Sequence, residues 1–341
     1  MTKCAKVPIK EAQQAKRDLI EQEVLDHNYF TEKDSQFIYF PLKENYSGKY
    51  PTEEKKVNKR NRNKIATPFK EALVNILTTE ELKIAKTAYD HLGEIAIIEI
   101  PEEIRNKEKE IAKKLLESNP QVKTVLRKDD KHDGVYRTQK MKFLAGEETK
   151  IATYKENNCT LKVNVEEVYF SARLSTERKR IAEMIKENEE VLVMFSGAAP
   201  YPCVFAKNTP AKHIDGVEIN PKGHEFGLEN IKKNKVEDKV NLYCGDVREI
   251  VPTLNKTYDR IVMPLPKTAE EFLDIAIPVA NKNATIHMYA FYHEDEFYKA
   301  TDEIEKYCKK LKREYKLLEI AKSGQHAPRT YRICVDFKLL N

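Results

Sequence analysis

Residues 190–341 alternate between short apolar runs and segments of helical periodicity. The apolar runs predict strands, which read EVLVMF, IDGVEI, VNLYC, DRIVM, ATIHMYAF and RICVDFKL in chain order. Segments such as FGLENIKKNK and DEFYKATDEIEKYCKKLKREY predict helices between them. This alternation is typical of an open, mainly parallel sheet with helices on both faces. Because ligands bind such sheets beyond the carboxyl ends of the strands, we expect a binding site there.

The rest of the chain predicts further domains, as a length of 341 residues allows. Residues 1–48 show a short strand, an amphipathic helix and a strand pair, which predict a small α/β domain. Residues 49–64 have almost no hydrophobic periodicity and predict a basic linker. Residues 65–180 resume strand and helix patterning, including a helix that starts at Pro101, and predict a middle α+β domain. The α/β domain with the Rossmann-like sheet then covers residues 181–341.

Charge and cysteine usage limit the class of protein. The formal net charge of +5 permits a polyanionic partner. KKVNKRNRNK in the linker and KKLKREYK, expected as a helix near the C-terminus, could contact phosphates, although charge runs are more often solvated faces. The six cysteines are scattered without CxxC spacing, which predicts no metal site, no disulfide framework and a cytoplasmic location. No apolar run approaches the roughly 18 residues of a membrane span, so no membrane association is expected.

The run VLVMFSGAAP ends a predicted strand in small residues. Phe195 closes the strand, and Ser196 and Gly197 follow it, so the backbone there can approach a ligand closely. A helix that starts next would direct free N–H groups toward that ligand. However, a dinucleotide-binding loop has three glycines where this loop has one. Taken alone, the stretch fits a tight strand-to-helix turn better than a ligand site.

Three later strand ends carry groups that suit a nucleoside. Glu218 ends the next strand, 21 residues beyond Gly197, and could accept hydrogen bonds from both ribose hydroxyls. Asp246 closes the third strand, where its side chain could accept a hydrogen bond from an adenine amino group. The fourth strand ends in PLPK, from Pro264 to Lys267. Any one of these could be an ordinary solvated strand end, but four features in this order indicate an adenosine-containing ligand.

In this order the four stretches resemble a class I S-adenosylmethionine-dependent methyltransferase. More narrowly, the chain resembles the archaeal and eukaryotic tRNA (guanine-N1)-methyltransferases that modify the guanosine at tRNA position 37. The matching motifs are VYFSARLSTERKRIAE, FLAGE, INP, GDVRE, PLPK and HAPR. The resemblance implies S-adenosylmethionine as the cofactor and tRNA as the partner. It also implies that the small N-terminal domain contacts the outer corner of the tRNA and that the middle domain binds RNA.

The reaction that the resemblance implies needs specific side chains. Guanine N1 carries a proton at neutral pH, so its methylation needs a base for that proton and a donor for the charge that grows on O6. The resemblance makes Glu177 the base, Arg137 the O6 partner and Arg173 a support of the site. Arg173 and Glu177 stand four residues apart in RLSTER, so an ordinary surface ion pair on one helix face is the competing interpretation. The cofactor-binding candidates are Phe195, Ser196, Gly197, Glu218, Ile219, Asn220, Asp246, Val247 and Pro264.

Two departures from the family pattern bear on the exact reaction. Pro264 stands where the family usually has asparagine, and Ser196 and residues 198–200 replace the more usual alanine and glycine-rich residues of the loop. The predicted function is methyl transfer from S-adenosylmethionine to N1 of guanosine 37 by a monomeric enzyme. One alternative is a wyosine-pathway enzyme at the same position, which methylates the tricyclic precursor or transfers an aminocarboxypropyl group. The other is a non-catalytic RNA-binding protein.

Overall fold

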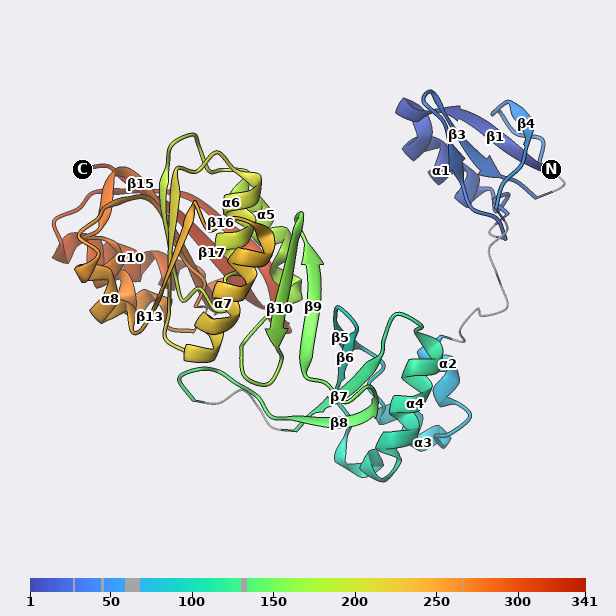
Figure 1. The fold of residues 1–341 in the computed structure, drawn as a ribbon, viewed down its shortest axis with the longest axis horizontal. Coiled ribbons are helices and arrows are strands. Elements are labelled where there is room, and N and C mark those ends of the chain that lie inside the picture. The colour runs from blue at the N-terminus through green and yellow to red at the C-terminus, as the bar shows by residue number, and fades with distance from the viewer. Residues whose placement is uncertain (27, 44–45, 59–67, 130–133, 266) are drawn as a thin grey trace. The chain divides into compact units, whose positions relative to one another are not determined.

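A computed structural model describes the chain except for residues 27, 44–45, 59–67, 130–133 and 266. The chain forms two compact units, residues 1–67 and residues 68–341. Sheets and helices build both units (Figure 1), and the predicted α/β class is confirmed. Within the described part of the chain, no helix has the length and apolar composition needed to cross a lipid bilayer.

The first unit is an antiparallel sheet covered by helix α1. Its strands lie in the order β2-β3-β1-β4, so that β1 pairs with both β3 and β4. Ala15 and Leu19 of α1 stand four residues apart on one helix face and are buried in the apolar core of this unit. The elements span Thr2–Pro8 (β1), Ala12–Glu21 (α1), Glu32–Lys33 (β2), Phe37–Pro41 (β3) and Thr52–Lys55 (β4).

The predicted linker, residues 49–64, contains a strand. β4 lies inside this range and pairs with β1 from Thr2 opposite Lys55 to Ala5 opposite Thr52. The strand escapes sequence prediction because it is an edge strand whose side chains, Thr-Glu-Glu-Lys, are mostly exposed and lack apolar alternation. Much of the basic run KKVNKRNRNK falls on residues 59–64, which lie outside the described residues.

The N-terminal part of the second unit is built around the sheet β5-β6-β7-β8. β6 and β7 are parallel, and the two outer pairs are antiparallel. The helix predicted at Pro101 begins as a 3-10 segment, η3, and continues as α4, which buries Ile111 and Leu115 against the sheet. The elements span Phe69–Leu73 (α2), Thr79–Ile84 (α3), Tyr89–Leu92 (β5), Ile95–Ile98 (β6), Glu102–Lys107 (η3), Glu108–Ser118 (α4), Thr124–Lys128 (β7) and Met141–Gly146 (β8).

A hairpin of β9 and β10 follows and packs against helix α7 (Figure 1). Two buried asparagines of α7 attach to the edge of β10. The amide of Asn230 accepts from the N–H of Lys162 at 2.7 Å and donates to its carbonyl at 2.9 Å, and Asn234 does the same with Thr160 at 2.9 and 2.8 Å. The hairpin is therefore bonded to the sheet-covering helix, although the sequence places it in the domain before residue 181. The elements span Ile151–Glu156 (β9), Cys159–Asn164 (β10) and Pro221–Asn234 (α7).

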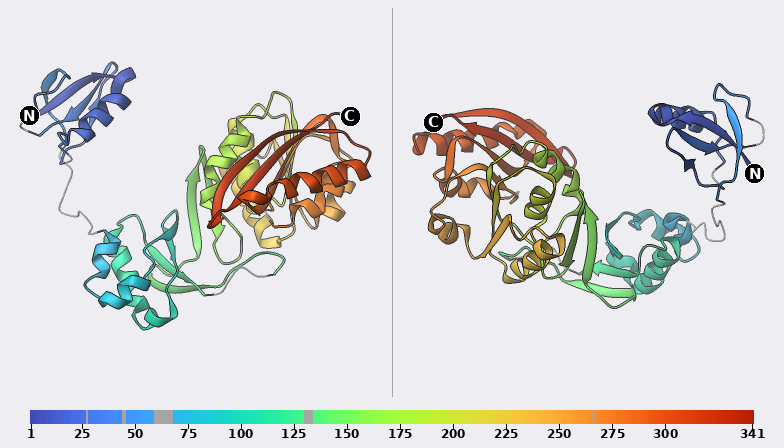
Figure 2. Two further views of the ribbon diagram at one scale, coloured as in Figure 1. Left: turned by 180° about the vertical axis from the view of Figure 1, so that it is seen from behind. Right: turned by 45° about the horizontal axis from the view of Figure 1, so that its top comes forward.

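The remaining strands form a seven-stranded sheet in the order β13-β12-β11-β14-β15-β17-β16. Strands β11 to β15 are parallel, and β17 and β16 are antiparallel additions. Helices cover both faces (Figures 1 and 2), because Leu192 and Met194 of β11 pack toward α8–α10 while Val191 and Val193 pack toward α5–α7. The elements span Ala172–Leu174 (η4), Ser175–Ala182 (α5), Glu190–Met194 (β11), Pro200–Asn208 (α6), His213–Glu218 (β12), Val240–Cys244 (β13), Val247–Thr253 (α8), Tyr258–Met263 (β14), Ala269–Phe272 (η5), Leu273–Ala276 (α9), Ala280–His293 (β15), Glu294–Glu296 (η6), Tyr298–Lys310 (α10), Tyr315–Ala327 (β16) and Thr330–Leu339 (β17).

Strand β16 corrects one helix prediction. The helical pattern was expected to run to Tyr315, but α10 ends at Lys310 and β16 begins at Tyr315. The basic stretch KKLKREYK is therefore a helix end, a turn and the start of a strand instead of a basic helix. Leu, Lys and Glu favour helix locally, but pairing with β17 over the length of β16 satisfies the backbone and overrides that preference.

Candidate functional site

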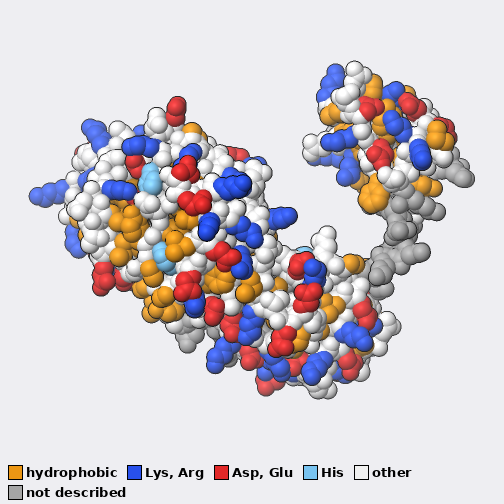
Figure 3. Space-filling view, in the orientation of Figure 1, with side chains coloured by type: hydrophobic (Ala, Val, Ile, Leu, Met, Phe, Trp, Pro, Cys, Tyr) orange, Lys and Arg blue, Asp and Glu red, His pale blue; other side chains and the backbone are white. Residues whose placement is uncertain are grey.

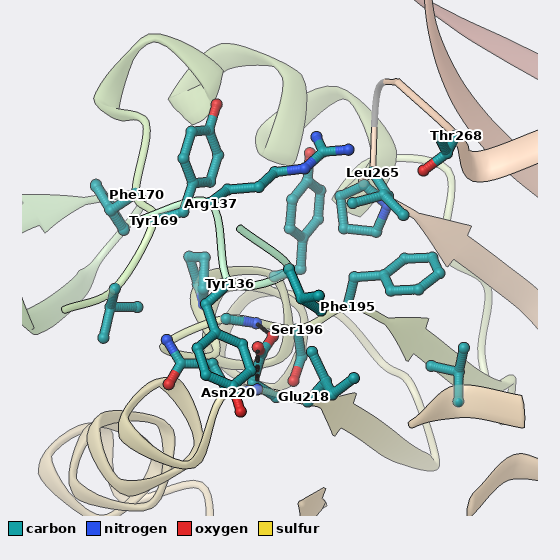
Figure 4. Close-up of a pocket in the computed structure, with 18 of the residues that line it drawn as sticks. Tyr136, Arg137, Tyr169, Phe170, Phe195, Ser196, Glu218, Asn220, Leu265 and Thr268 are labelled. Atoms are coloured by element: carbon teal, nitrogen blue, oxygen red, sulfur yellow. Dashed lines mark hydrogen bonds between the residues drawn. The ribbon is translucent and has the colours of Figure 1, made fainter. Parts of the chain in front are cut away.

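A cavity of about 360 Å³ lies at the carboxyl edge of the seven-stranded sheet (Figure 4). Loops that follow β11, β12, β13 and β14 form much of its wall. Residues 134–137 and 168–171, which precede the sheet in the sequence, form further parts of the wall. All the predicted cofactor-binding residues line this one cavity, namely Phe195, Ser196, Gly197, Glu218, Ile219, Asn220, Asp246, Val247 and Pro264.

The loop after β11 has an unusual backbone. Phe195, Gly197 and Ala199 have positive φ angles of 60°, 56° and 59°, a conformation that costs non-glycine residues of order 1–3 kcal/mol. Between them, Ser196 donates its N–H to a carbonyl of β12 at 2.8 Å and so continues the sheet beyond β11. The atom nearest to a Cβ built at Gly197 would be the carbonyl oxygen of Tyr169 at 3.7 Å, so conformation, and not crowding, requires glycine. The loop thus presents open backbone at the strand end.

Glu218 ends β12, and its carboxylate is held by the backbone. One oxygen accepts the N–H of Gly197 at 2.6 Å, and the other accepts the N–H of Asn220 at 2.8 Å. Burial raises the pKa of Glu218 above its ordinary value, although the two amide donors act in the opposite direction. A Cβ at Gly223 would come within 3.1 Å of the Glu218 Cγ, so this glycine leaves room for the carboxylate. Figure 4 shows Glu218 beside Ser196 and Asn220.

Asp246 lies after β13 and caps helix α8 by accepting the N–H of Arg248 at 2.8 Å. The preceding Gly245 donates its N–H to the carbonyl oxygen of Glu218 at 2.9 Å, which ties the ends of β12 and β13 together. The carboxylates of Glu218 and Asp246 therefore stand at adjacent strand ends in one cavity, as their positions in the sequence predict. Val247 follows in the first turn of α8.

Pro264 follows β14 directly and lines the cavity. Leu265 donates its N–H to the carbonyl of Met263 at 2.8 Å, so the chain turns tightly around the proline. Nearby, the rings of Phe195 and Phe272 pack edge to face with their centroids 4.9 Å apart. Because proline has no side-chain donor or acceptor, this strand end offers a ligand only backbone polar groups at Pro264.

Arg137 reaches the cavity from the middle part of the chain, next to Tyr136. Its backbone has a positive φ of 51°. Burial lowers the pKa of Arg137 from its usual value, but an arginine remains charged near neutral pH. Figure 4 shows the guanidinium directed toward Leu265, with Glu218 and Ser196 on the opposite side of the cavity. The site therefore places a cation across from the Glu218 carboxylate.

Glu177 is buried, and the cavity lining does not include it. Its carboxylate accepts two hydrogen bonds from Arg180, at 2.7 and 2.9 Å, and one from the Tyr289 hydroxyl at 3.1 Å. Arg180 also donates to Asp336 at 2.6 Å. Tyr201 does line the cavity, and its hydroxyl donates a hydrogen bond to the Tyr289 hydroxyl at 2.9 Å. Two tyrosine hydroxyls thus connect the cavity to Glu177.

Arg173 does not pair with Glu177, so the competing interpretation of these two residues as a surface ion pair is wrong. Arg173 lies in η4 while Glu177 lies in α5. The Arg173 side chain is 75% exposed, stands outside the cavity lining and donates to Asp90 of β5 at 2.5 Å. Asp90 also accepts from Lys128 of β7 at 2.9 Å. Arg173 therefore connects the segment before α5 to the middle sheet.

Several residues of the cavity wall were not predicted. Tyr136 stands next to Arg137 in the sequence GVYRTQK, and Tyr169 and Phe170 stand before Arg173 in the motif that begins VYFSARL. Aromatic residues in such positions are as typical of a core as of a site, so the sequence alone gave them no role. Other unpredicted wall residues come from the segment between β14 and α9, namely Leu265 of the PLPK motif and, beyond that motif, Thr268, Glu271 and Phe272.

His287, Cys334 and Asp336 form a buried group, among the described residues, whose ligand atoms lie within 4.8 Å of one another. Their atoms already take part in hydrogen bonds. His287 Nδ1 and Cys334 Sγ lie 2.7 and 3.2 Å from the same Asp336 oxygen, and Arg260 lies 2.7 Å from His287 Nε2. Arg180 supplies a second guanidinium to the group and donates to Asp336. Because two guanidinium groups repel a cation, we interpret this group as a hydrogen-bond network.

Three family models match successive parts of the chain. Residues 152–318 match the TRM5/TYW2 methyltransferase domain. Residues 69–149 match the TYW2 N-terminal domain, and residues 4–50 match the tRNA methyltransferase 5 N-terminal domain. The matches together extend over both units of the structure.

Individual proteins are similar over most of their length. The chain is 36% identical over 340 residues to tRNA (guanine(37)-N(1))-methyltransferase Trm5b of Pyrococcus abyssi. The alignment covers 99% of each chain. It is 34% identical over 303 residues to tRNA (guanine(37)-N(1))/4-demethylwyosine(37)-methyltransferase Taw22 of Nanoarchaeum equitans, which covers 74% of this chain and 100% of that protein.

Solved structures share the fold. A crystal structure of Trm5b from Pyrococcus abyssi covers 100% of both chains, with 36% identity and a TM-score of 0.75. A complex of aTrm5 and tRNALeu covers 99% of both chains, with 30% identity and a TM-score of 0.72. Methanocaldococcus jannaschii Trm5 in complex with adenosine covers 99% of both chains, with 28% identity and a TM-score of 0.69. The chain therefore belongs to the TRM5/TYW2 family of methyltransferases.

Proposed function

We propose that this chain transfers a methyl group from S-adenosylmethionine to N1 of the guanosine at tRNA position 37. The observation that carries the proposal is a cavity that has Glu218 and Asp246 at the sheet edge and Arg137 across from Glu218. Membership of the family supports it, since the Pyrococcus abyssi relative is named for this activity. The enzyme acts in the cytoplasm as a monomer without a metal, and tRNA is its partner. Arg173 acts outside the cavity, as a support through its contact with Asp90.

Glu218 and Asp246 hold the nucleoside part of the cofactor. The Glu218 carboxylate, already oriented by two backbone amides, accepts hydrogen bonds from the ribose hydroxyls. Asp246 accepts from the adenine amino group, and the left-handed backbone at Gly197 allows the ligand to approach closely. The remaining cofactor candidates supply wall contacts around these groups. When bound, S-adenosylmethionine supplies a methyl group on a positively charged sulfur.

Cofactor affinity is expected to fall as the pH is lowered, through a midpoint above the ordinary glutamate pKa of 4.5. Burial raises the pKa of Glu218 in the free protein, and only the ionised carboxylate accepts from both ribose hydroxyls. Protonation therefore weakens binding. Isothermal titration with S-adenosylmethionine from about pH 5 to 8 measures the effect. Glu218→Gln should bind more weakly and lose this pH dependence, and an unchanged dependence in that variant would contradict the assignment.

Arg137 and Glu177 act on the target base. The Arg137 guanidinium stabilises the negative charge that develops on O6. As the N1–methyl bond forms, the N1 proton passes to the Tyr201 hydroxyl, the Tyr201 proton to Tyr289, and the Tyr289 proton to the Glu177 carboxylate. The hydroxyl contacts of 2.9 and 3.1 Å support this route. Glu177 is then the net proton acceptor without leaving Arg180.

Tyr289→Phe is expected to slow single-turnover methyl transfer by about 10²-fold. The substitution interrupts the chain of hydroxyls but keeps the buried ring, so the affinities for tRNA and S-adenosylmethionine should not change. Rapid-quench measurement at saturating tRNA gives the rate. Tyr292→Phe, on the same strand, is the matched control and should react like the wild type. A wild-type rate in Tyr289→Phe would rule out the proton route.

One observation favours a second substrate at the same tRNA position. Pro264 offers no side-chain hydrogen bond to a target base, so this part of the wall does not distinguish guanine from a larger ring system. The Nanoarchaeum equitans relative is named for both guanine and 4-demethylwyosine. Methylation of that tricyclic base is therefore the second candidate activity.

Methyl transfer to unmodified tRNA transcripts tests the proposed function. Transcripts with guanosine at position 37 should gain one methyl group, and transcripts with adenosine there should gain none. Nucleoside mass spectrometry of tRNA that carries the tricyclic precursor tests the second activity in the same assay. A larger mass gain would indicate aminocarboxypropyl transfer instead. No gain on any tRNA, together with no binding of S-adenosylmethionine, would indicate a non-catalytic RNA-binding protein.

A further inference from the structure

The end of β15 and the hairpin of β16 and β17 extend past the carboxyl edge of the parallel strands. β14 pairs with β15 as far as Met263 opposite Met288, whereas β15 continues to pair with β17 as far as His293 opposite Thr330. Residues of β15 beyond Met288 therefore stand on the same sheet edge as the cavity. The hairpin turn contains the HAPR motif, to which the proposed function gives no role.

Four side chains at this edge form a continuous series of contacts that we call the aromatic ladder: Tyr169, Arg332, Phe291 and His326. Tyr169 lines the cavity, and its hydroxyl oxygen accepts from the Arg332 guanidinium at 3.3 Å. The guanidinium carbon lies 5.2 Å from the centroid of the Phe291 ring. The rings of Phe291 and His326 have centroids 4.6 Å apart and planes inclined at 38°. The aromatic ladder thus leads from the cavity to the exposed His326 in the hairpin.

The aromatic ladder has features that ordinary core packing does not explain. His326 is exposed, so its ring has a free side in solvent. The Nε–H of Arg332 is buried and has no hydrogen-bond acceptor among the described residues, an arrangement that is costly unless a ligand supplies one. Both groups belong to the chain of side-chain contacts that starts at the cavity.

The hairpin turn keeps the His326 end of the aromatic ladder in place. Arg329 has a left-handed backbone with a φ of 56° and ion-pairs with Glu294 at 2.5 Å and Asp295 at 3.0 Å. Its carbonyl also accepts the N–H of Glu294 at 2.8 Å. These contacts fix the turn against η6 and offset part of the negative charge of two carboxylates that would repel a polyanion.

We propose that the aromatic ladder binds the unpaired bases next to the target nucleotide in the tRNA anticodon loop. This inference rests on the proposed function, which requires the target base to leave its stack. The neighbouring bases then lose a stacking partner, and aromatic rings and arginine planes are the protein groups that replace it. On the face shown in Figure 3, basic and acidic side chains are interspersed over the second unit.

Binding of full-length tRNA to His326→Ala and Phe291→Leu tests the proposal. Each variant should raise the Kd for tRNA about 10-fold, the loss expected for one stacked base. The single-turnover rate at saturating tRNA and the affinity for S-adenosylmethionine should not change, because neither residue lines the cavity. Gln325→Ala, at the exposed position next to His326, is the matched control and should bind tRNA like the wild type.

Anticodon stem-loops with an abasic residue on either side of position 37 provide the second measurement. One of the two abasic RNAs should bind the wild-type protein about 10-fold more weakly, and His326→Ala should bind it no more weakly than it binds the intact RNA. The proposal is overturned if both variants bind tRNA like the wild type. It is also overturned if His326→Ala binds the abasic RNA more weakly than the intact RNA by the same factor as the wild type does, so that the two losses of affinity multiply. Failure of the proposed function can be told apart from failure of the aromatic-ladder proposal. If the proposed function is wrong, the wild type transfers no methyl group to guanosine 37, whatever these RNA affinities are.

Discussion

Replacing Glu177 with glutamine is expected to lower the single-turnover rate of methyl transfer by about 10²–10⁴-fold, the contribution of a general base. Glutamine keeps the size of the side chain and a carbonyl oxygen for Arg180 and Tyr289, but it cannot take a proton at neutral pH. The affinities for S-adenosylmethionine and tRNA should stay close to those of the wild type, because Glu177 does not line the cavity.

The matched control for this variant is Glu183→Gln. Glu183 lies at the end of the same helix, and its side chain is 66% exposed. Replacing this carboxylate with an amide should therefore leave the rate unchanged. Circular dichroism and thermal unfolding of both variants show whether the fold is kept. If Glu177→Gln is folded and transfers methyl groups at the wild-type rate, Glu177 is not the proton acceptor.

The second large effect is expected on stability. Arg178→Met should lower the free energy of unfolding by about 3–5 kcal/mol, because it leaves the buried carboxylate of Glu156 without a partner. The two side chains are 2% and 1% exposed and form a bidentate pair with contacts of 2.5 and 2.6 Å. Arg178 also donates to the carbonyl of Ser171, which lines the cavity, at 3.1 Å. Urea unfolding followed by circular dichroism gives the free energy.

A double variant distinguishes an unpaired charge from lost packing. Arg178→Met with Glu156→Leu removes both charges and should be more stable than Arg178→Met alone. Lys179→Met, at the neighbouring 63% exposed position, should change stability by less than about 0.5 kcal/mol. Strictly additive losses in the double variant would show that the pair does not act as a unit.

The interior of the large sheet could be predicted from the sequence. The apolar runs locate β11, β12, β13 and β14 to within one residue at either end, because strands covered on both faces are nearly continuous apolar segments. The edge strands β4 and β16 were missed, since their side chains are mostly exposed and polar and carry no periodic signal. Their pairing with β1 and β17 depends on segments distant in the sequence.

The residues of the candidate site also divide into those that the sequence could locate and those that it could not. Ser196, Glu218, Asp246 and Pro264 each stand at the end of a different strand, so an ordered set of strand ends was enough to place them together. Arg137 comes from a segment before the sheet, and only its resemblance to a family motif identified it. Contacts such as those of the aromatic ladder join three separate segments and leave no local pattern in the sequence.

The sequence by itself determined the α/β sheet and the order of the nucleoside-binding groups along its edge, because the carboxyl ends of parallel strands meet at one edge whatever the loops do. Only the tertiary structure decided the surroundings of Glu177. Tyr289 stands 112 residues from it, and Asp336 stands 156 residues from its partner Arg180. These groups meet because β15 and β17 are neighbours in the sheet and α5 packs on the face that they share, and long-range packing of that kind has no signature in local sequence.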